Sequence, residues 1–313
     1  MPRTVVTRAP GKVIIAGEHF VVSGAPAVAA AIDVYATARV RELGSGPSVI
    51  YADDLGLRAV VDGGAPSEMA PLLAVVGALR KMGYDLPPFE AHVSSEIPGS
   101  AGLGSSAAVG AALALALSEL AGDGLDRDGL FAATLEGERV AHVNPSGVDP
   151  AAVVYGGVIL YRRGQGVVGR ARWAGSASLI VADSGVRRST GSAVSSVLSL
   201  LDRLGQLRQL LLAAAEGLVR AAWDAVLSSR PDVLGALLNV NHGLLSAIGV
   251  STPELDELVH LARRSGALGA KLTGAGWGGS IIAVASPEAA EAVQRALASR
   301  SRWVRAVEPV DGG

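Results

Sequence analysis

A glycine- and serine-rich segment directly precedes an apolar segment in residues 97–120, IPGSAGLGSSAAVGAALALALSEL. The apolar half consists of strong helix formers, so we expect a helix that begins at Ser105 or Ser106, with one of the two as its N-cap. A helix N-terminus offers unpaired N–H groups to an anion, and glycine lets the anion approach the backbone. The segment therefore predicts a phosphate-binding loop, in which a serine hydroxyl could bind nucleotide-associated Mg²⁺. The alternative is that the serines only cap the helix.

A second glycine-rich segment, GAGWGG at residues 274–279, also has the glycine spacing of a dinucleotide-binding loop. In both places the elements that follow the loop differ from those of a dinucleotide-binding fold. The first segment leads to two helices instead of a helix and a strand ending in an acidic residue, and the second leads into the strand-like SIIAVAS. Neither segment has the Walker A form, so a Rossmann dehydrogenase is disfavoured.

The chain has only three lysines, Lys12, Lys81 and Lys271, and two of them adjoin glycine-rich segments. Either arginine is simply preferred throughout, or a compact ammonium is required at Lys12 and Lys271. The lysine count by itself favours the first interpretation.

Hydrophobic periodicity and turn residues predict irregularly alternating strands and helices, which favours an α+β fold. Strands are expected at 3–8, 12–17, 28–43, 89–97, 176–185, 280–286 and 302–310, with a strand and a turn within 153–164 and a strand pair within 46–64. Helices are expected at 68–84, 105–121, 126–143 and 287–300, and across most of 190–265. A glycine-rich change of composition at 156–175 indicates a domain boundary.

The composition excludes several classes of protein. Half of the 313 residues are hydrophobic, the net charge is −2, and there is no cysteine. The charge argues against a protein that binds nucleic acid through phosphate neutralisation. The absence of cysteine excludes disulfides and thiolate metal sites. We find no signal peptide and no apolar run long enough for a membrane helix, and we expect a cytoplasmic protein without a nucleic-acid or membrane partner.

Three motifs together resemble the GHMP kinase superfamily. They are PGKVIIAGEH at 10–19, PGSAGLGSSAA at 98–108 and KLTGAGWGGS at 271–280, and their order spans the chain. Within the superfamily, EGERVAHVNPSGVDPAA at 136–152 and GEHFVVSG at 17–24 are most similar to the mevalonate kinase branch. A galactokinase would be expected to show GEHTDY, and a homoserine kinase to lack the first motif.

The resemblance implies a two-domain α+β fold. It implies an N-terminal domain at 1–160 with a left-over-right mixed sheet and helices, and a ferredoxin-like C-terminal domain at 161–313. It also implies that ATP and mevalonate are the substrates and Mg²⁺ the cofactor. A homodimer is allowed.

The resemblance places the catalytic aspartate at Asp149 and the active-site lysine at Lys12. An aspartate followed by proline is also typical of a helix N-cap, which would hold a general base rigidly. A nearby ammonium would stabilise the transferred phosphoryl group. The implied ATP-binding residues are Pro98, Gly99, Ser100, Ala101, Gly102, Leu103, Gly104, Ser105, Ser106, Ala107 and Ala108.

The resemblance pairs Glu138 with Ser106 as ligands of Mg²⁺, a cation that takes few protein oxygens. It implies acceptor-side contacts from Glu18 and His19, for which a structural salt bridge is the alternative. The remaining acceptor-side residues are Thr190, Gly274 and Ala275, with Arg188 and Ser189 as weaker candidates. His92, His142, His242 and His260 show no metal-ligand spacing.

The chain departs from the mevalonate kinase pattern at a few positions. Ser100 and Trp277 stand where glycine is usual, and Ser280 where cysteine is common. Phe20 and Ser23 replace the usual alanine and tyrosine. These changes affect the acceptor more than the reaction, so a phosphomevalonate kinase, a mevalonate 3-kinase and a non-catalytic metabolite-binding protein stay as alternatives.

Overall fold

The computed structural model describes residues 2–142, 145–173, 177–187, 190–310 and 312. Seven of its strands form a mixed sheet in which β3 and β5 are parallel and all other neighbours antiparallel. The order is β4-β3-β5-β2-β6-β7, and β1 pairs with β2 outside this path. The strands are β1 (Thr4–Ala16), β2 (Pro26–Glu42), β3 (Val49–Ala52), β4 (Leu57–Val60), β5 (Phe89–Ser95), β6 (Val158–Arg162) and β7 (Gly166–Ala171).

The first strand is longer than the sequence predicts. The two short strands expected around Pro10 and Gly11 are one continuous β1, whose register against β2 shifts between these two residues and again between Ile14 and Ala16. Proline supplies no N–H to the ladder, so a local irregularity accommodates it without ending the strand.

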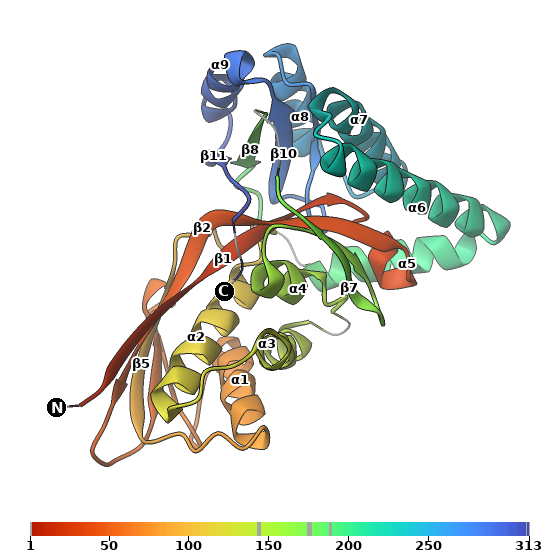
Figure 1. The fold of residues 1–313 in the computed structure, drawn as a ribbon. Coiled ribbons are helices and arrows are strands. Elements are labelled where there is room, and N and C mark those ends of the chain that lie inside the picture. Colours follow the sequence, from red (N-terminus) through yellow and green to blue (C-terminus); the bar gives the residue numbers. More distant parts are fainter. Residues whose placement is uncertain (1, 143–144, 174–176, 188–189, 311, 313) are drawn as a thin grey trace.

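Four helices cover one face of this sheet, below β1 and β2 in Figure 1. Apolar side chains of α1, α2 and α3 pack against β2 and β5, and α2 is buried on nearly all sides because it consists mainly of alanine and leucine. The helices are α1 (Ala70–Lys81), α2 (Ser105–Ala121), α3 (Arg127–Ala141) and α4 (Val148–Tyr155). Short 3-10 turns, η1 (Phe20–Ser23), η2 (Asp53–Leu55) and η3 (Ser67–Met69), complete this part.

The second sheet is antiparallel, with the order β11-β8-β10-β9. Its four strands and intervening helices follow the β-α-β-β-α-β order of a ferredoxin-like fold, as expected. The strands are β8 (Ser178–Asp183), β9 (Gly269–Leu272), β10 (Ser280–Ala285) and β11 (Trp303–Val307). The helices are α5 (Thr190–Arg203), α6 (Gln206–Leu227), α7 (Pro231–Ala247), α8 (Pro253–Arg264) and α9 (Pro287–Ala298). In the part of the chain that is described, no helix combines the length and apolarity needed to span a bilayer.

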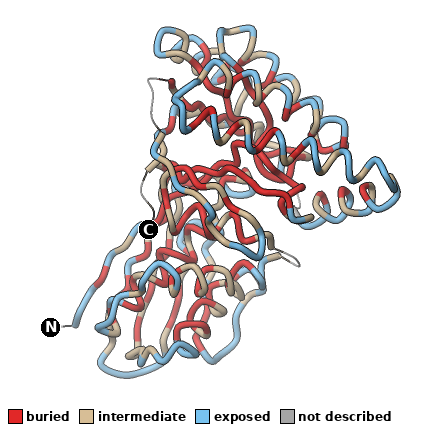
Figure 2. The backbone as a smooth tube through the Cα atoms, turned by 45° about the vertical axis from the view of Figure 1, so that its right-hand side comes forward, coloured by how far each residue is buried: buried red, intermediate tan, exposed pale blue. Residues whose placement is uncertain are grey.

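The two sheets share a buried core. Side chains of β1, β2, α6, β8 and β10 meet in one hydrophobic cluster. In Figure 2 the backbone across the middle of the molecule is coloured mostly as buried. The C-terminal segment returns to the first sheet, where the Val310 N–H donates to Ala31 O at 3.1 Å. The first sheet includes β6 and β7 and so continues to Ala171. The division of the chain at residue 160 stays a prediction.

Candidate active site

The loop between β5 and α2 has an alternating backbone. Ser100, Gly102 and Gly104 have φ values of 62°, 81° and 75°. The intervening Ala101 and Leu103 are buried and anchor the loop in the core. Alternation of this kind turns successive N–H groups toward one side and forms an anion-binding concavity. The loop thus has the geometry expected of a phosphate cradle.

Helix α2 begins at Ser105, as expected, but its N-cap is not a serine. Its N-cap is the left-handed Gly104, and Ser105 and Ser106 are its first two helical residues. The prediction that a serine caps this helix is therefore wrong. The hydroxyl of Ser105 lies 3.2 Å from that of Ser95 at the end of β5, whereas Ser106 is exposed. Ser106 consequently remains accessible at the positive end of the helix dipole.

Lys12 is buried beneath this loop, with 2% of its surface exposed. Its Nζ donates to Gly102 O at 2.9 Å and lies 3.0 Å from Oδ1 of Asp149. Its backbone N–H donates to Leu103 O at 2.8 Å. The close approach depends on glycine, because a Cβ at Gly11 would lie 3.0 Å from Leu103 O. The structure thus brings the predicted lysine and aspartate into direct contact at the loop.

Asp149 is the second residue of α4, and its side chain is 30% exposed. The N-cap is the left-handed Gly147, so the expectation of an aspartate N-cap is wrong. Tyr161 on β6 holds the preceding turn, since its hydroxyl donates to Ser146 O at 2.8 Å. A Cβ at Gly147 would lie 2.3 Å from that hydroxyl. Tyr161 therefore fixes where α4 begins, a role that no sequence motif indicated.

Glu138 on α3 faces the same site and is almost completely buried. Burial raises the pKa of Glu138 most, and the Asp149 charge adds to the rise, whereas His142, Ser106 and Lys12 oppose it. The Nε2 atom of His142 lies 3.5 Å from Glu138 Oε2. The other carboxylate oxygen, Oε1, is buried and has no hydrogen-bond partner among the described residues.

This unpartnered oxygen fits a cation ligand. No three His, Asp or Glu side chains gather as a metal site in the described part of the chain. A cation here would therefore be held by Glu138, the Ser106 hydroxyl, nucleotide phosphate oxygens and water, which is a ligand set that suits Mg²⁺.

Glu18 is buried in an ion pair with Lys271, and Asn241 donates to its second oxygen at 3.1 Å. The next residue, His19, has a φ of 61° and its Nε2 lies 3.0 Å from Ala275 O in the third glycine-rich segment. The acceptor-side roles of these residues, Gly274 included, stay predictions. Lys12 and Lys271, the two lysines beside glycine-rich segments, are both buried and paired, as the alternative to a composition bias expects.

The two positions where glycine is usual in the family carry strained backbone. Ser100 and Trp277 have φ values of 62° and 58°, in the left-handed region that favours glycine. Trp277 is held there by hydrogen bonds from its N–H to Val250 O and from its indole to Gly249 O.

The side chains of three predicted acceptor-side residues lie outside the description. Arg188 and Ser189 lie outside the described residues, and Thr190 begins α5 but its side chain is likewise outside the description.

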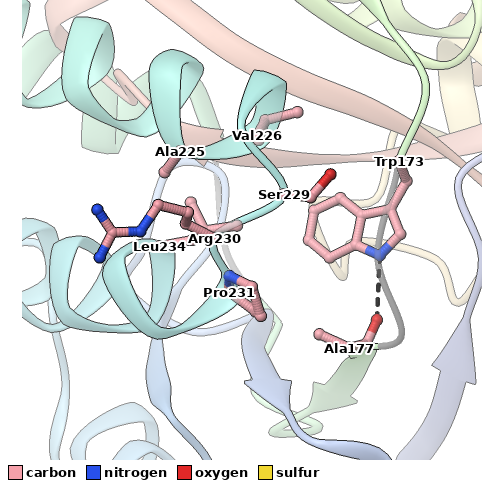
Figure 3. Close-up of a pocket in the computed structure, with 8 residues that line it drawn as sticks. All are labelled: Trp173, Ala177, Ala225, Val226, Ser229, Arg230, Pro231 and Leu234. Atoms are coloured by element: carbon pink, nitrogen blue, oxygen red, sulfur yellow. Dashed lines mark hydrogen bonds between the residues drawn. The ribbon is translucent and has the colours of Figure 1, made fainter.

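The pocket in Figure 3 is separate from this set of residues. It lies between α6, the start of α7 and the segment before β8, and the indole of Trp173 donates to Ala177 O at 3.0 Å beside it. None of its lining residues is a predicted site residue.

Comparison with known proteins gives a consistent result. The family described as "GHMP kinases N terminal domain" matches residues 72–157, and "GHMP kinases C terminal" matches residues 222–302. The mevalonate kinase of Aeropyrum pernix is 44% identical over 288 residues, which cover 90% of this chain and 89% of that protein.

Comparison with two solved structures shows that the fold alone does not identify the acceptor. The L. major mevalonate kinase in complex with R-mevalonate superposes with a TM-score of 0.82 at 30% identity, covering 100% of this chain and 97% of that one. The Lactococcus lactis galactokinase complexed with galactose reaches a TM-score of 0.85 at 20% identity, covering 99% and 94%. The second likeness shows the fold alone, so the acceptor has to be argued from sequence and site.

Proposed function

The chain belongs to the GHMP kinase family, and we propose that it phosphorylates mevalonate with ATP to give 5-phosphomevalonate. The observation that carries the proposal is the 3.0 Å contact between Lys12 Nζ and Asp149 Oδ1 at the glycine loop. The 44% identity to the mevalonate kinase of Aeropyrum pernix, over 90% of this chain, supports mevalonate as the acceptor.

In this proposal the glycine loop at residues 98–104 and the start of α2 bind the triphosphate through backbone N–H groups. Asp149 accepts the proton of the acceptor hydroxyl, and its accessible side chain at the rigid start of α4 suits a general base. Lys12 stabilises the charge on the transferred phosphoryl group and holds Asp149 in place. Its buried stem leaves the ammonium little freedom to move.

Ser106 and Glu138 would hold Mg²⁺. The cation would neutralise phosphate charge and orient the terminal phosphoryl group. The buried, unpartnered Oε1 of Glu138 supports this assignment. A cytoplasmic location and a homodimer stay predictions.

The test is an ADP-release assay with mevalonate, phosphomevalonate, galactose and homoserine as acceptors. We expect turnover with mevalonate that depends on Mg²⁺ and little turnover with the other three. A preference for phosphomevalonate would indicate a phosphomevalonate kinase instead. Stabilisation by Mg-ATP without turnover of any acceptor would instead favour a metabolite-binding protein on the same scaffold.

A further inference from the structure

The free edge of β1 connects the glycine loop to the second sheet. Lys12 and Ile14 lie two residues apart, and their N–H groups donate outside the β1–β2 ladder. The N–H of Lys12 reaches Leu103 O at 2.8 Å, and that of Ile14 reaches Thr273 Oγ1 at 2.9 Å. Alternate residues of a strand direct their backbone groups to the same edge. The same edge of β1 therefore contacts both the loop before α2 and the third glycine-rich segment.

Lys271 on β9 completes the second of these contacts. Its Nζ donates to Ile14 O at 3.2 Å and to the carboxylate of Glu18, which follows β1. Thr273 also donates to Ile14 O, at 3.0 Å. The other oxygen of Glu18 accepts from Asn241 on α7 at 3.1 Å. Both oxygens of Glu18 are thus engaged by groups from the second half of the chain.

The ion pair is fully desolvated, since Lys271 is 0% and Glu18 1% exposed. Burial lowers the pKa of Lys271, and Glu18 opposes the shift. Buried ion pairs gain little stability over well-packed apolar side chains, so this pair is better explained by the geometry it imposes. The burial also excludes direct contact between Lys271 and a substrate.

The geometry imposed by the pair reaches His19, because it directly follows Glu18. The left-handed backbone of His19 is unfavourable for a non-glycine residue and needs to be held by its surroundings. Its Nε2 donates to Ala275 O at 3.0 Å, four residues after Lys271. The same short segment therefore fixes Ile14, Glu18 and His19.

We propose that Lys271 is a positioning residue for phosphoryl transfer: by holding Ile14 and Glu18 it fixes the strand that carries Lys12 and the turn that carries His19. The inference rests on the proposed function for the identity of the acceptor. Nucleotide binding depends on the loop before α2, which Lys271 does not contact.

The test is Lys271→Met, which removes the charge and keeps most of the length and volume. Initial rates are measured with mevalonate and ATP varied in turn. We expect the KM for mevalonate to rise about tenfold or more and kcat to fall, because small displacements of reacting groups have large effects on rate. We expect the KM for ATP and the thermal stabilisation by Mg-ATP to change less than twofold.

Val284→Ala is the matched control, because Val284 is a buried residue of β10 that the Glu18–Lys271–Asn241 contacts do not include. It creates a cavity in the same sheet and lowers stability, but both KM values should stay at the wild-type level. A Lys271→Met enzyme with wild-type kcat and acceptor KM overturns the proposal, and so does an equal effect in the control.

Asn241→Leu keeps the proposal testable if Lys271→Met does not fold. This variant removes one hydrogen bond to Glu18 and should raise the same acceptor KM by a smaller factor, with the KM for ATP unchanged. An unaltered acceptor KM overturns the proposal. The wild-type acceptor panel separates this outcome from failure of the proposed function: if another acceptor supports turnover, the Lys271 comparison is made with that acceptor.

Discussion

Gly104 lies against the side-chain stem of Lys12: a Cβ at Gly104 would lie 2.7 Å from Cγ of Lys12. Gly104 also has a φ of 75°, which other residues adopt with strain. Glycine is therefore required at position 104 for two reasons. It adopts the left-handed turn into α2, and its lack of a Cβ leaves room for the Lys12 side chain.

Gly104→Ala should consequently lower both stability and activity. We expect the backbone strain to cost about 1–2 kcal/mol, and the displaced Lys12 to lower kcat at least tenfold. Thermal unfolding and steady-state rates measure the two effects. Gly99→Ala in the same loop is the control: its Cβ meets nothing within 4 Å, and its stability should stay within about 0.5 kcal/mol of wild type. Equal effects of the two substitutions would contradict the role given to Gly104.

His242 should make the fold sensitive to acid. Burial lowers the pKa of His242 to about 4, although Asp256 opposes the shift. The unfolded chain thus binds a proton that the folded chain does not bind between about pH 6.5 and 4, so stability falls as the pH falls through this window. The full loss is about 3 kcal/mol, at 1.36 kcal/mol per pKa unit.

His242→Asn should weaken this acid dependence. Denaturant unfolding at several pH values between 7 and 4 measures it, with the exposed His260→Asn as a control. His242 Nδ1 accepts from the Leu272 N–H at 3.4 Å, and asparagine retains an acceptor there. An unchanged pH dependence in His242→Asn would show that other groups control the acid response.

Tyr161→Phe tests the turn that begins α4. Loss of the hydrogen bond to Ser146 O leaves a carbonyl with one partner fewer, and we expect a cost of about 1 kcal/mol. Because Asp149 follows three residues later, kcat should also fall several-fold, with little change in the KM for ATP. Tyr155→Phe, which loses an exposed hydrogen bond to Asp128, should leave kcat unchanged. Loss of stability without loss of kcat would separate Tyr161 from the site.

The elements around the site could be predicted from the sequence because their signals are local. Glycine and serine next to a helix-forming run identify the loop and α2, and alternating apolar residues identify β5. The predicted N-caps, Ser105 or Ser106 for α2 and Asp149 for α4, were wrong, since in both places a preceding glycine in the left-handed conformation takes the position. Serine and aspartate are favoured N-caps on average, but here the close packing of the loops determines which residue is the N-cap.

The long-range contacts could not be predicted in this way. Nothing in the local sequence of Glu18 indicates that its partners are Lys271 and Asn241, more than 220 residues away. The rarity of lysine was the only available signal, and a preference for arginine explains it equally well. The resemblance predicts Lys12 and Asp149 as neighbouring site residues, and the atoms that bring them into contact follow from the packing of β1 and α4.

Glu138→Gln should stabilise the protein in the absence of Mg-ATP. The pKa of Glu138 is raised, chiefly by burial, so the folded state binds its proton more tightly than the unfolded state. Stability then falls as the pH rises through the raised pKa, and at neutral pH the buried charge is a cost. Glutamine removes that charge and should raise the melting temperature without ligand.

The same variant should lose its response to the cation. We expect a smaller thermal shift with Mg-ATP and a higher Mg²⁺ concentration for half-maximal rate. Glu136→Gln, two residues earlier on α3 at a half-buried position, is the control. A Glu138→Gln protein that is less stable without ligand would indicate that the carboxylate makes favourable contacts, and a wild-type Mg²⁺ requirement would remove it from the proposed ligand set.

Asp149→Asn should abolish most turnover without disturbing the site. Asparagine keeps an oxygen that can accept from Lys12 Nζ, so the contact seen at 3.0 Å is retained while the base is lost. We expect kcat to fall by about 10²–10⁴, the contribution typical of general acid–base catalysis, and the thermal shift with Mg-ATP to stay near the wild-type value.

Lys12→Met, by contrast, removes the ammonium from Asp149 and Gly102 together, so it should lower both turnover and stability. The double variant should be little slower than Lys12→Met, because two groups that act as a unit are not additive. Near-normal turnover by Asp149→Asn would assign the proton to another acceptor.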